Sequence, residues 1–272
     1  MKASIGAELL VLRKRTSSAI LLAIWVLLAI FFAYVLEYLE APGDTVPPQL
    51  LPDSFGAHVL AGFPFFGGVF ALMLGVLAVG GDYGLDTLKT LFTQGPGRLR
   101  IFGAKLLALA IGLVPFVIVV FVVGAGASYL IAQVEGAAVD WPSAWTVVRA
   151  LGIGWLILAT WAALGVLLGA LTRGTALAIG VGILYTLVIE GLVSALASQV
   201  SLLEPLVELF VRANAYSLVA PLGLSVEEAM SDGPGAFAGP FVAGEQAVLV
   251  LISYMVGFLA LSAILVRRRD VT

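Results

Sequence analysis

The composition of this sequence is that of an integral membrane protein. Of its 272 residues, 61% are hydrophobic and 11% are charged, and the mean hydropathy is +1.10, whereas soluble domains contain about 45–50% apolar and about 25% charged residues. The absence of Cys excludes disulfides, thiolate catalysis and Cys-based metal sites. The formal net charge is -3 and says little about partners, and we expect no nucleic-acid partner.

Continuous apolar segments predict six membrane-spanning helices. A helix needs about 20 apolar residues to cross the hydrocarbon, where lipid offers no partner for backbone N–H and C=O groups. Barrel strands would instead alternate apolar and polar residues over short segments. The sequence therefore predicts an all-α integral membrane protein, with residues 1–272 as a single transmembrane domain and spans at about 17–39, 57–80, 106–132, 147–171, 175–197 and 244–266.

The first predicted element is an amphipathic helix over residues 3–15, ahead of span one. Ile5, Leu9 and Leu12 recur at helical spacing, and the segment ends in three cations. This pattern suits a helix that lies in the membrane interface. The alternative is a charged flank that only fixes the topology.

A charged segment interrupts the chain between spans two and three. Residues 82–93 predict a short amphipathic helix on the cytoplasmic face, and the sequence QGPG at 94–97 ends it. Its apolar face would comprise Leu85, Leu88 and Phe92, and the polar residues beside this face are Asp82, Asp86 and Lys89. Such a helix could dock a soluble partner, and the alternative is an ordinary loop.

Cations follow this segment at the inner end of span three. Arg98, Arg100 and Lys105 can reach water or lipid phosphate while their aliphatic stems stay in apolar surroundings.

The connection between spans four and five, TRGT at 172–175, predicts a tight helical hairpin.

Span five contains Glu190, an ionisable residue inside an apolar helix. A charge in lipid costs about 3 kcal/mol or more, so such a residue is a candidate for function. Glu190 could relay protons or bind a cationic substrate; alternatively it is a structural carboxyl that is hydrogen-bonded to a neighbouring span or lies near the outer interface. Residues 198–243 then predict two short helices on or dipping into the outer face, followed by a Gly/Pro loop before span six.

The distribution of cations predicts the orientation. Basic residues near span ends are retained in the cytoplasm, and with both termini inside only Arg149 and Arg212 would lie outside. The cytoplasmic set is Lys2, Arg13, Lys14, Arg15, Lys89, Arg98, Arg100, Lys105, Arg173, Arg267, Arg268 and Arg269. Most acidic residues, Glu37, Glu135 and Glu204 among them, would lie on the other side.

Small residues in three spans predict close helix packing. A glycine lets the backbone of a neighbouring helix approach closely. The candidates are Gly124 and Gly126 in span three, Gly165 and Gly169 in span four, and Gly180 and Gly182 in span five.

The stretch DYGLDTLKTLFTQGPGRLRIFGAKLLAL resembles a segment of type-two ABC-transporter permeases. In that family an acidic residue, Gly-Thr, a Leu-rich helix, a Pro-containing turn, Arg and finally Lys follow one another at the start of span three. Asp82 matches the acidic position, Thr87 the threonine, Pro96 and Arg98 the turn, and Lys105 the lysine. Asp86 stands where the family usually has glycine. The six spans, the N-terminal helix, the inside termini and the long last outer loop also fit.

The resemblance implies the membrane-spanning subunit of an ABC exporter in the cell membrane. Two permease subunits, as a homodimer or heterodimer, would form the pathway, and two ATPase subunits would grip helices like 82–93. The chain has no GxxxxGK[ST] phosphate loop, so ATP and Mg²⁺ should be bound by a separate polypeptide. The resemblance assigns this chain no catalytic residue, cofactor or metal of its own.

Two other functions are consistent with the residues. One is an ion- or proton-coupled secondary transporter that uses Glu190. The other is an enzyme like the intramembrane prenyltransferases, in which Asp82 and Asp86 would hold Mg²⁺ and a diphosphate. That chemistry would be expected to need a second aspartate-rich motif, and Asp270 is isolated.

Overall fold

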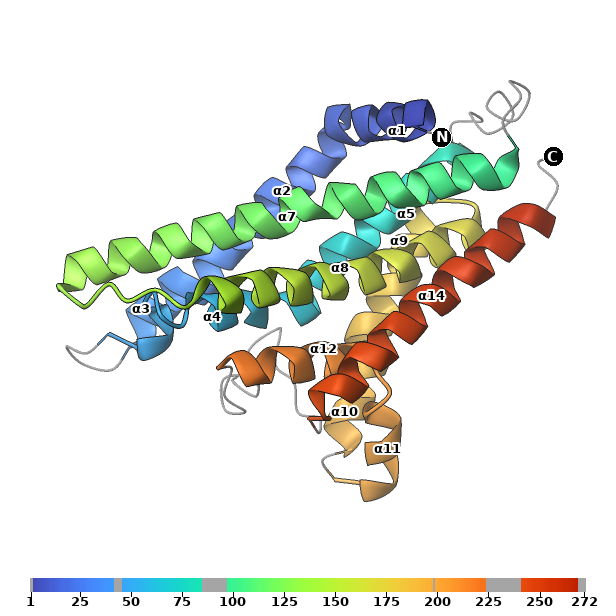
Figure 1. The fold of residues 1–272 in the computed structure, drawn as a ribbon. Helices are drawn as coiled ribbons and strands as arrows, with labels where there is room; N and C mark the ends of the chain where they lie inside the picture. The colour runs from blue at the N-terminus through green and yellow to red at the C-terminus, as the bar shows by residue number, and fades with distance from the viewer. Residues whose placement is uncertain (1, 42–45, 85–96, 198, 224–240, 269–272) are drawn as a thin grey trace.

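The computed structural model describes residues 2–41, 46–84, 97–197, 199–223 and 241–268, and every regular element in these ranges is helical (Figure 1). The helices of the first half are α1 (Lys2–Lys14), α2 (Thr16–Ala29), η1 (Ile30–Leu36), α3 (Glu37–Glu40), η2 (Pro48–Leu50), α4 (Phe55–Ala61), η3 (Phe63–Gly67), α5 (Gly68–Gly84) and α7 (Arg98–Glu135). Those of the second half are α8 (Ala144–Thr172), α9 (Ala176–Leu184), η4 (Tyr185–Glu190), α10 (Gly191–Ala197), η5 (Ser201–Leu203), α11 (Glu204–Val207), α12 (Val211–Val219), η6 (Ala220–Leu222) and α14 (Gly244–Arg268).

The described residues contain six helices long and apolar enough to cross a membrane, which confirms the predicted number of spans. Spans two and four are mostly buried within the chain, whereas spans one, five and six are mostly exposed. The six helices are Thr16–Glu40, Phe63–Gly81, Arg98–Glu135, Ala144–Thr172, Ala176–Ala197 and Gly244–Arg268.

Two spans differ in length from the prediction, and local residues explain both differences. Span two begins at Phe63 rather than near 57, because Pro64 lacks an N–H and interrupts the helical ladder. The Gly67 N–H donates instead to the Gly62 carbonyl, at 3.0 Å, in a π-helical turn. Span three is longer than expected at both ends: it begins at Arg98, directly after its N-cap Gly97, and ends at Glu135. The next residue, Gly136, has a φ of 65°, the left-handed conformation that stops many helices.

Glycines bring α5 and α8 into backbone contact at the centre of the bundle. A Cβ atom on Gly75 would lie 2.0 Å from the Ala162 carbonyl oxygen, and one on Gly165 would lie 2.1 Å from the Leu72 carbonyl oxygen. Of the predicted packing glycines, Gly124, Gly169 and Gly182 also have close neighbours. The prediction was wrong for Gly126 and Gly180, which have nothing within 4 Å of a Cβ position.

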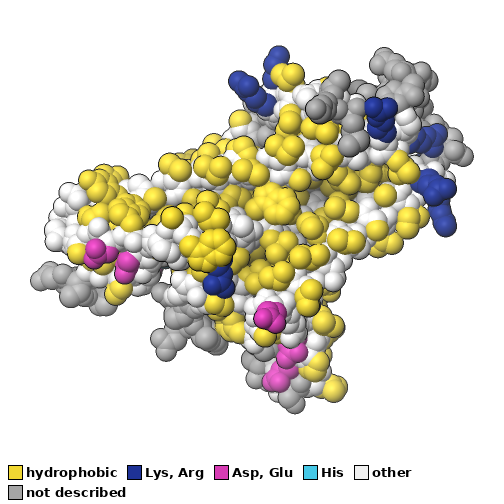
Figure 2. Space-filling view, in the orientation of Figure 1, with side chains coloured by type: hydrophobic (Ala, Val, Ile, Leu, Met, Phe, Trp, Pro, Cys, Tyr) yellow, Lys and Arg dark blue, Asp and Glu magenta, His cyan; other side chains and the backbone are white. Residues whose placement is uncertain are grey.

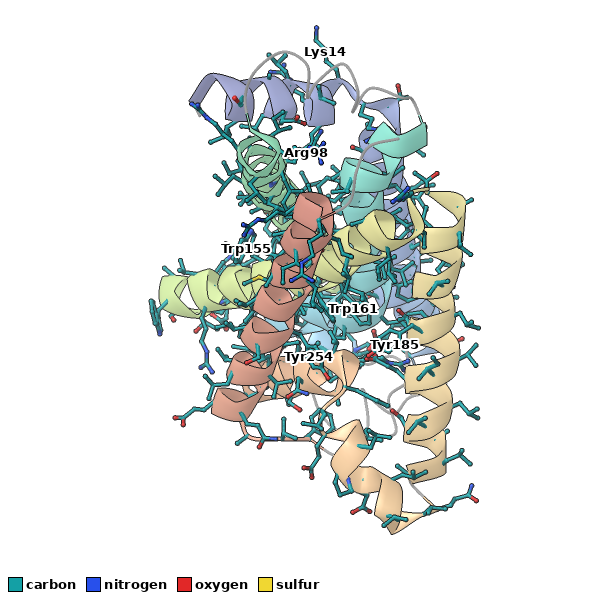
Figure 3. The ribbon with its side chains drawn as sticks, turned by 90° about the vertical axis from the view of Figure 1, so that its right-hand side faces the viewer. Lys14, Arg98, Trp155, Trp161, Tyr185 and Tyr254 are labelled. Atoms are coloured by element: carbon teal, nitrogen blue, oxygen red, sulfur yellow. The ribbon has the colours of Figure 1, made fainter. Side chains whose placement is uncertain are left out.

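The two ends of the bundle differ in charge. We call them the α1 end, where α1, the start of α7 and the last turn of α14 lie, and the α12 end, opposite to it (Figure 1). Lys and Arg side chains gather at the α1 end, and Asp and Glu side chains lie toward the other end (Figure 2). Lys14 and Arg98 both lie at the α1 end in Figure 3.

The short helix α12 is buried along its whole length. All nine residues from Val211 to Val219 are buried, including Arg212, Asn214 and Ser217. The sequence predicts short helices on or dipping into the outer face, and α11 and α12 are two such helices before span six. However, α12 lies within the bundle, where it packs against α14, α8 and η3, because its polar side chains find partners there.

Candidate functional site

The predicted coupling segment is only partly within the described residues. Asp82 lies in the last turn of α5, although its side chain is outside the described part of the chain. Arg98 is the first residue of α7, and Lys105 lies two turns further along the same helix. The remaining predicted positions, Leu85, Asp86, Thr87, Leu88, Lys89 and Phe92, lie outside the described residues.

Lys105 joins α1 to span three. Its ammonium lies 3.0 Å from each carboxylate oxygen of Glu8, and both side chains are largely buried. The ammonium donates a charge-assisted hydrogen bond to Glu8 Oε2, and the other carboxylate oxygen completes the ion pair. The lysine that the sequence assigns to ATPase coupling therefore anchors the N-terminal helix, a contact between residues 97 positions apart.

The last turns of α5 contact two further elements at the α1 end. Arg15 separates α1 from α2, and its Nη1 donates to the Leu77 carbonyl at 2.7 Å. A cation here complements the negative end of the α5 dipole. On the other side, a Cβ on Gly80 would lie 2.9 Å from the Gly174 carbonyl oxygen, in the hairpin between spans four and five.

Glu190 is buried in a polar cluster at the α12 end. Its Oε1 accepts hydrogen bonds from the Tyr185 hydroxyl at 2.8 Å and from the Val211 backbone N–H at 3.1 Å. The Arg212 backbone N–H also faces this carboxylate. The side chain is 1% exposed, so the cost of burying a carboxylate is offset by donors from its own span and from α12.

Arg212 links the same cluster to span two. Its guanidinium carbon lies 5.2 Å from the centre of the Phe65 ring, in cation–π geometry. The Arg212 side chain also hydrogen-bonds the Tyr216 hydroxyl, and burial raises the pKa of Tyr216 to about 12, which keeps this phenol neutral. We call Tyr185, Glu190, Phe65, Arg212 and Tyr216 the Glu190 cluster. Figure 3 shows Tyr185 beside Trp161 and Tyr254 of the neighbouring spans.

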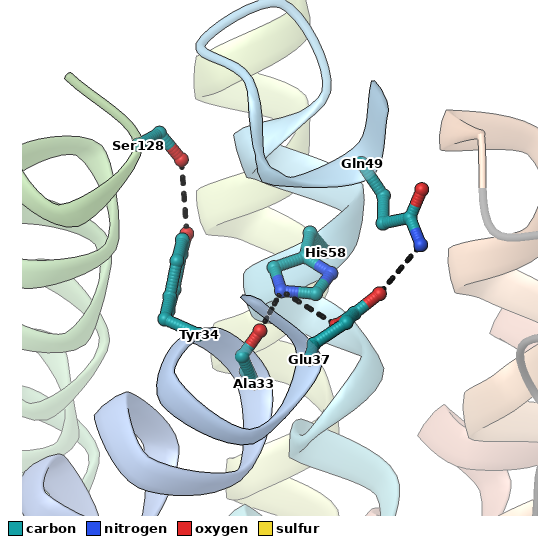
Figure 4. A network of polar contacts seen from close by, with 6 residues as sticks. All are labelled: Ala33, Tyr34, Glu37, Gln49, His58 and Ser128. Atoms are coloured by element: carbon teal, nitrogen blue, oxygen red, sulfur yellow. Dashed lines mark hydrogen bonds and ion pairs between the residues drawn. The ribbon is translucent and has the colours of Figure 1, made fainter. Parts of the chain in front are cut away.

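A second polar network surrounds His58, the single histidine of the sequence (Figure 4). His58 Nε2 lies 2.5 Å from the Ala33 carbonyl oxygen and 3.4 Å from a Glu37 carboxylate oxygen. The carbonyl can only accept, so the proton is on Nε2. Glu37 also accepts from Gln49 Nε2 at 2.6 Å, and the Tyr34 ring meets the His58 ring edge-on, with 5.0 Å between centroids.

This His58 network connects spans one and three as well. The Ser128 hydroxyl of α7 donates to the Tyr34 hydroxyl at 3.2 Å, and Tyr38 hydrogen-bonds Glu135 near the end of the same helix. The network therefore joins α4 to spans one and three at the α12 end.

Three spans contain π-helical segments, and all three segments belong to the half of the bundle nearer α12. They are η1 in span one, η3 at the start of span two and η4 in span five. A π-turn inserts an extra residue into a helix and redirects its side chains, and such turns often occur at functional sites. The Glu190 cluster includes residues of η3 and η4, and the His58 network includes residues of η1. We therefore take the α12 end as the candidate functional region.

Sequence reasoning found Glu190 but not its partners. The distribution of cations identifies Arg212 only as one of two outside cations, and no pattern in the sequence points to Tyr185 or Phe65. A signal existed for Arg212, since it stands with Asn214 and Ser217 in an apolar stretch.

Among the described residues, no three His, Asp or Glu side chains gather where they could hold a metal ion.

Comparison with known proteins gives a family but no activity. No curated protein sequence shows a significant match to this chain. Residues 21–272 match the profile of a family described as "Protein of unknown function (DUF2705)". This match covers five of the six spans and nearly all of the first one, and the chain belongs to that family.

Proposed function

We propose that this chain is the membrane-spanning permease subunit of an ATP-driven ABC exporter in the cell membrane. The observation that supports the proposal most is the pattern from Asp82 to Lys105 between spans two and three, in a chain with six apolar helices and a separate helix before span one. The cation-rich α1 end would face the cytoplasm by the positive-inside rule, with both termini.

The contacts at the α1 end suit transmission of force from a cytoplasmic partner. A coupling helix over residues 82–93 would continue from the end of α5, whose last two turns contact Arg15 and the hairpin residue Gly174. Lys105, where the segment re-enters the membrane, holds α1 through Glu8. A push on the coupling helix would therefore reach α1, α5, α7 and the hairpin between spans four and five together.

The proposed complex needs partners that supply energy and complete the pathway. Two copies of a separate ABC ATPase would bind ATP and Mg²⁺, because the sequence contains no phosphate-binding loop. A second permease subunit, identical or related, would face this chain across the pathway. The apolar faces of spans one, five and six are exposed in the single chain and would contact lipid or that second subunit.

Purification from the native membrane tests the proposal directly. We expect the tagged chain to retain an ATPase that carries a GxxxxGK[ST] loop, identified by mass spectrometry. Leu88→Asp should abolish this retention, since it puts a charge on the predicted apolar docking face. Thr90→Asp is the matched control, because residue 90 lies on the opposite face of the same predicted helix and should leave binding intact.

Two results would contradict the proposal. One is a chain that purifies without any ATPase from membranes in which all candidate ATPases are expressed. The other is a chain that, alone in liposomes, transports in response to a pH gradient and loses this activity in Glu190→Gln, which would establish the secondary transporter instead.

A further inference from the structure

Helix α12 cannot cap its own N-terminus. The first N–H groups of a helix lack partners within the helix and are usually satisfied by a Ser, Thr, Asp or Asn side chain at the preceding position. The residue at that position is Phe210, which has no hydrogen-bonding side chain. Since α12 is buried, water cannot easily replace the missing cap.

Glu190 supplies the cap from another helix. Its carboxylate accepts from the N–H of Val211, the first residue of α12, and faces the N–H of Arg212, the second. A negative group at this position also complements the positive end of the helix dipole. A residue in the middle of span five thus accepts hydrogen bonds from the first N–H groups of a helix that begins 21 positions later.

The other contacts of α12 hold it to the remaining spans. Arg212 packs on Phe65 of span two. The Ser217 hydroxyl accepts from the Val242 N–H at 3.0 Å, just before span six, and donates to the Ala213 carbonyl at 2.8 Å. The contact with Glu190 differs from these in two respects: the acceptor is a carboxylate, and it comes from a π-helical segment of another span. Loss of this charge-assisted contact would therefore weaken the attachment of α12 more than loss of the neutral contacts.

We propose that Glu190 is a latch that keeps α12 inside the bundle and so closes the α12 end. While the carboxylate caps Val211 and Arg212, α12 fills the space between spans two, four and six. When the carboxylate is removed, the first N–H groups of α12 are buried without an acceptor, and α12 leaves its position more often. This inference does not depend on the energy source or direction of transport.

Reactivity of an engineered cysteine measures whether α12 is latched. The chain has no native Cys, so a single substitution gives a clean signal. Ala215 is 0% exposed and lies at the centre of α12, so Ala215→Cys should react slowly with a charged maleimide. The purified protein would be held in lipid nanodiscs, where both faces are accessible and the orientation in the membrane does not affect the result.

We expect Glu190→Ala to increase labelling at position 215 by about tenfold, which is the effect of losing one strong charge-assisted interaction. Glu190→Gln should give a smaller increase, because the amide oxygen still accepts from Val211 but carries no charge. Tyr185→Phe leaves the cap in place and should give the smallest. If Glu190→Ala folds poorly, the comparison of Glu190→Gln with Tyr185→Phe still tests the proposal, because the first should increase labelling more than the second.

Two controls separate a latch from general loss of structure. Ala163→Cys places the probe at a buried position of α8, where labelling should stay slow in all Glu190 variants. Leu202→Cys, at a position 84% exposed, should label rapidly throughout. Equal labelling at position 215 with and without Glu190, or parallel increases at positions 215 and 163, would overturn the latch.

Discussion

Single glycines decide how closely the central helices of this chain approach one another. Gly75 and Gly165 stand where α5 and α8 touch, and any side chain there would overlap backbone atoms of the facing helix. Backbone cannot move aside as the end of a flexible side chain can. By contrast, the three atoms nearest to a Cβ on Gly81 all belong to the Arg15 guanidinium. The same residue type therefore has very different importance at different positions.

Alanine substitutions test this difference at the residue scale. Gly75→Ala and Gly165→Ala should each destabilise the protein by about 1–3 kcal/mol, since overpacking forces the helices apart. Gly126→Ala and Gly180→Ala are matched controls, because they add a methyl group in open space within a helix, and they should leave stability unchanged or raise it by up to about 1 kcal/mol. Thermal unfolding of the purified variants in detergent would measure the effect. Equal losses at all four positions would show that close approach is not the cause.

At the scale of elements, α1 is attached to the bundle chiefly through α7. Ile5, Leu9 and Leu12, the predicted apolar stripe, are partly buried, whereas Leu10 and Val11 are exposed at 54% and 56%. One side of α1 thus faces the bundle, with Glu8 on Lys105, and the other side carries exposed apolar residues beside Arg13 and Lys14. This arrangement agrees with a helix that lies in the membrane interface.

The Glu8–Lys105 pair should control the attachment of α1. Glu8→Lys or Lys105→Glu leaves two like charges together, and because breaking a buried pair costs about 3 kcal/mol, amide hydrogen exchange in α1 should rise about tenfold or more. The double variant restores an opposite pair and should recover much of the protection. Mass spectrometry of peptides from residues 2–14 would measure this hydrogen exchange. Unchanged exchange in both single variants would show that packing alone holds α1.

At the scale of the whole molecule, charge is sorted between the two ends of the bundle. The described cations at the α1 end come from four separate places in the sequence: residues 13–15 between α1 and α2, the start of α7, the hairpin after α8 and the end of α14. Arg149 and Arg212, the two predicted exceptions, lie near the start of α8 and on α12. The folded chain thus brings together what the positive-inside rule assigns to one side.

Reporter fusions test the orientation of this bundle. A reporter after Thr272 should be cytoplasmic, and one inserted near Gly233 should be external, because an odd number of spans separates them. The activity of a reporter that works on only one side of the membrane would distinguish the two. Finding both reporters on the same side would contradict the arrangement of six spans.

The sequence by itself determined the membrane class, the number of spans and their order. This was possible because the bilayer imposes a length of about 20 apolar residues on each helix, and such a run can be read locally. It also determined that Glu190 needs an explanation, since a carboxylate is expensive in an apolar helix at any position. The break at Pro64 and the stop at Gly136 were likewise local signals, which refine the ends of spans two and three.

Only the tertiary structure decided which residues meet. Gly124 is packed and Gly126 is open, although both lie on α7, because residues two apart point to nearly opposite sides of a helix. Glu8 meets Lys105, Glu37 meets His58 and Glu190 meets the first turn of α12 across separations that periodicity does not encode. The burial of α12 has the same origin. From the sequence, a short helix that contains an arginine is expected at the outer surface. In the fold, the Phe65 ring packs against the Arg212 guanidinium and the Glu190 carboxylate caps the first turn of the helix, so α12 can be buried.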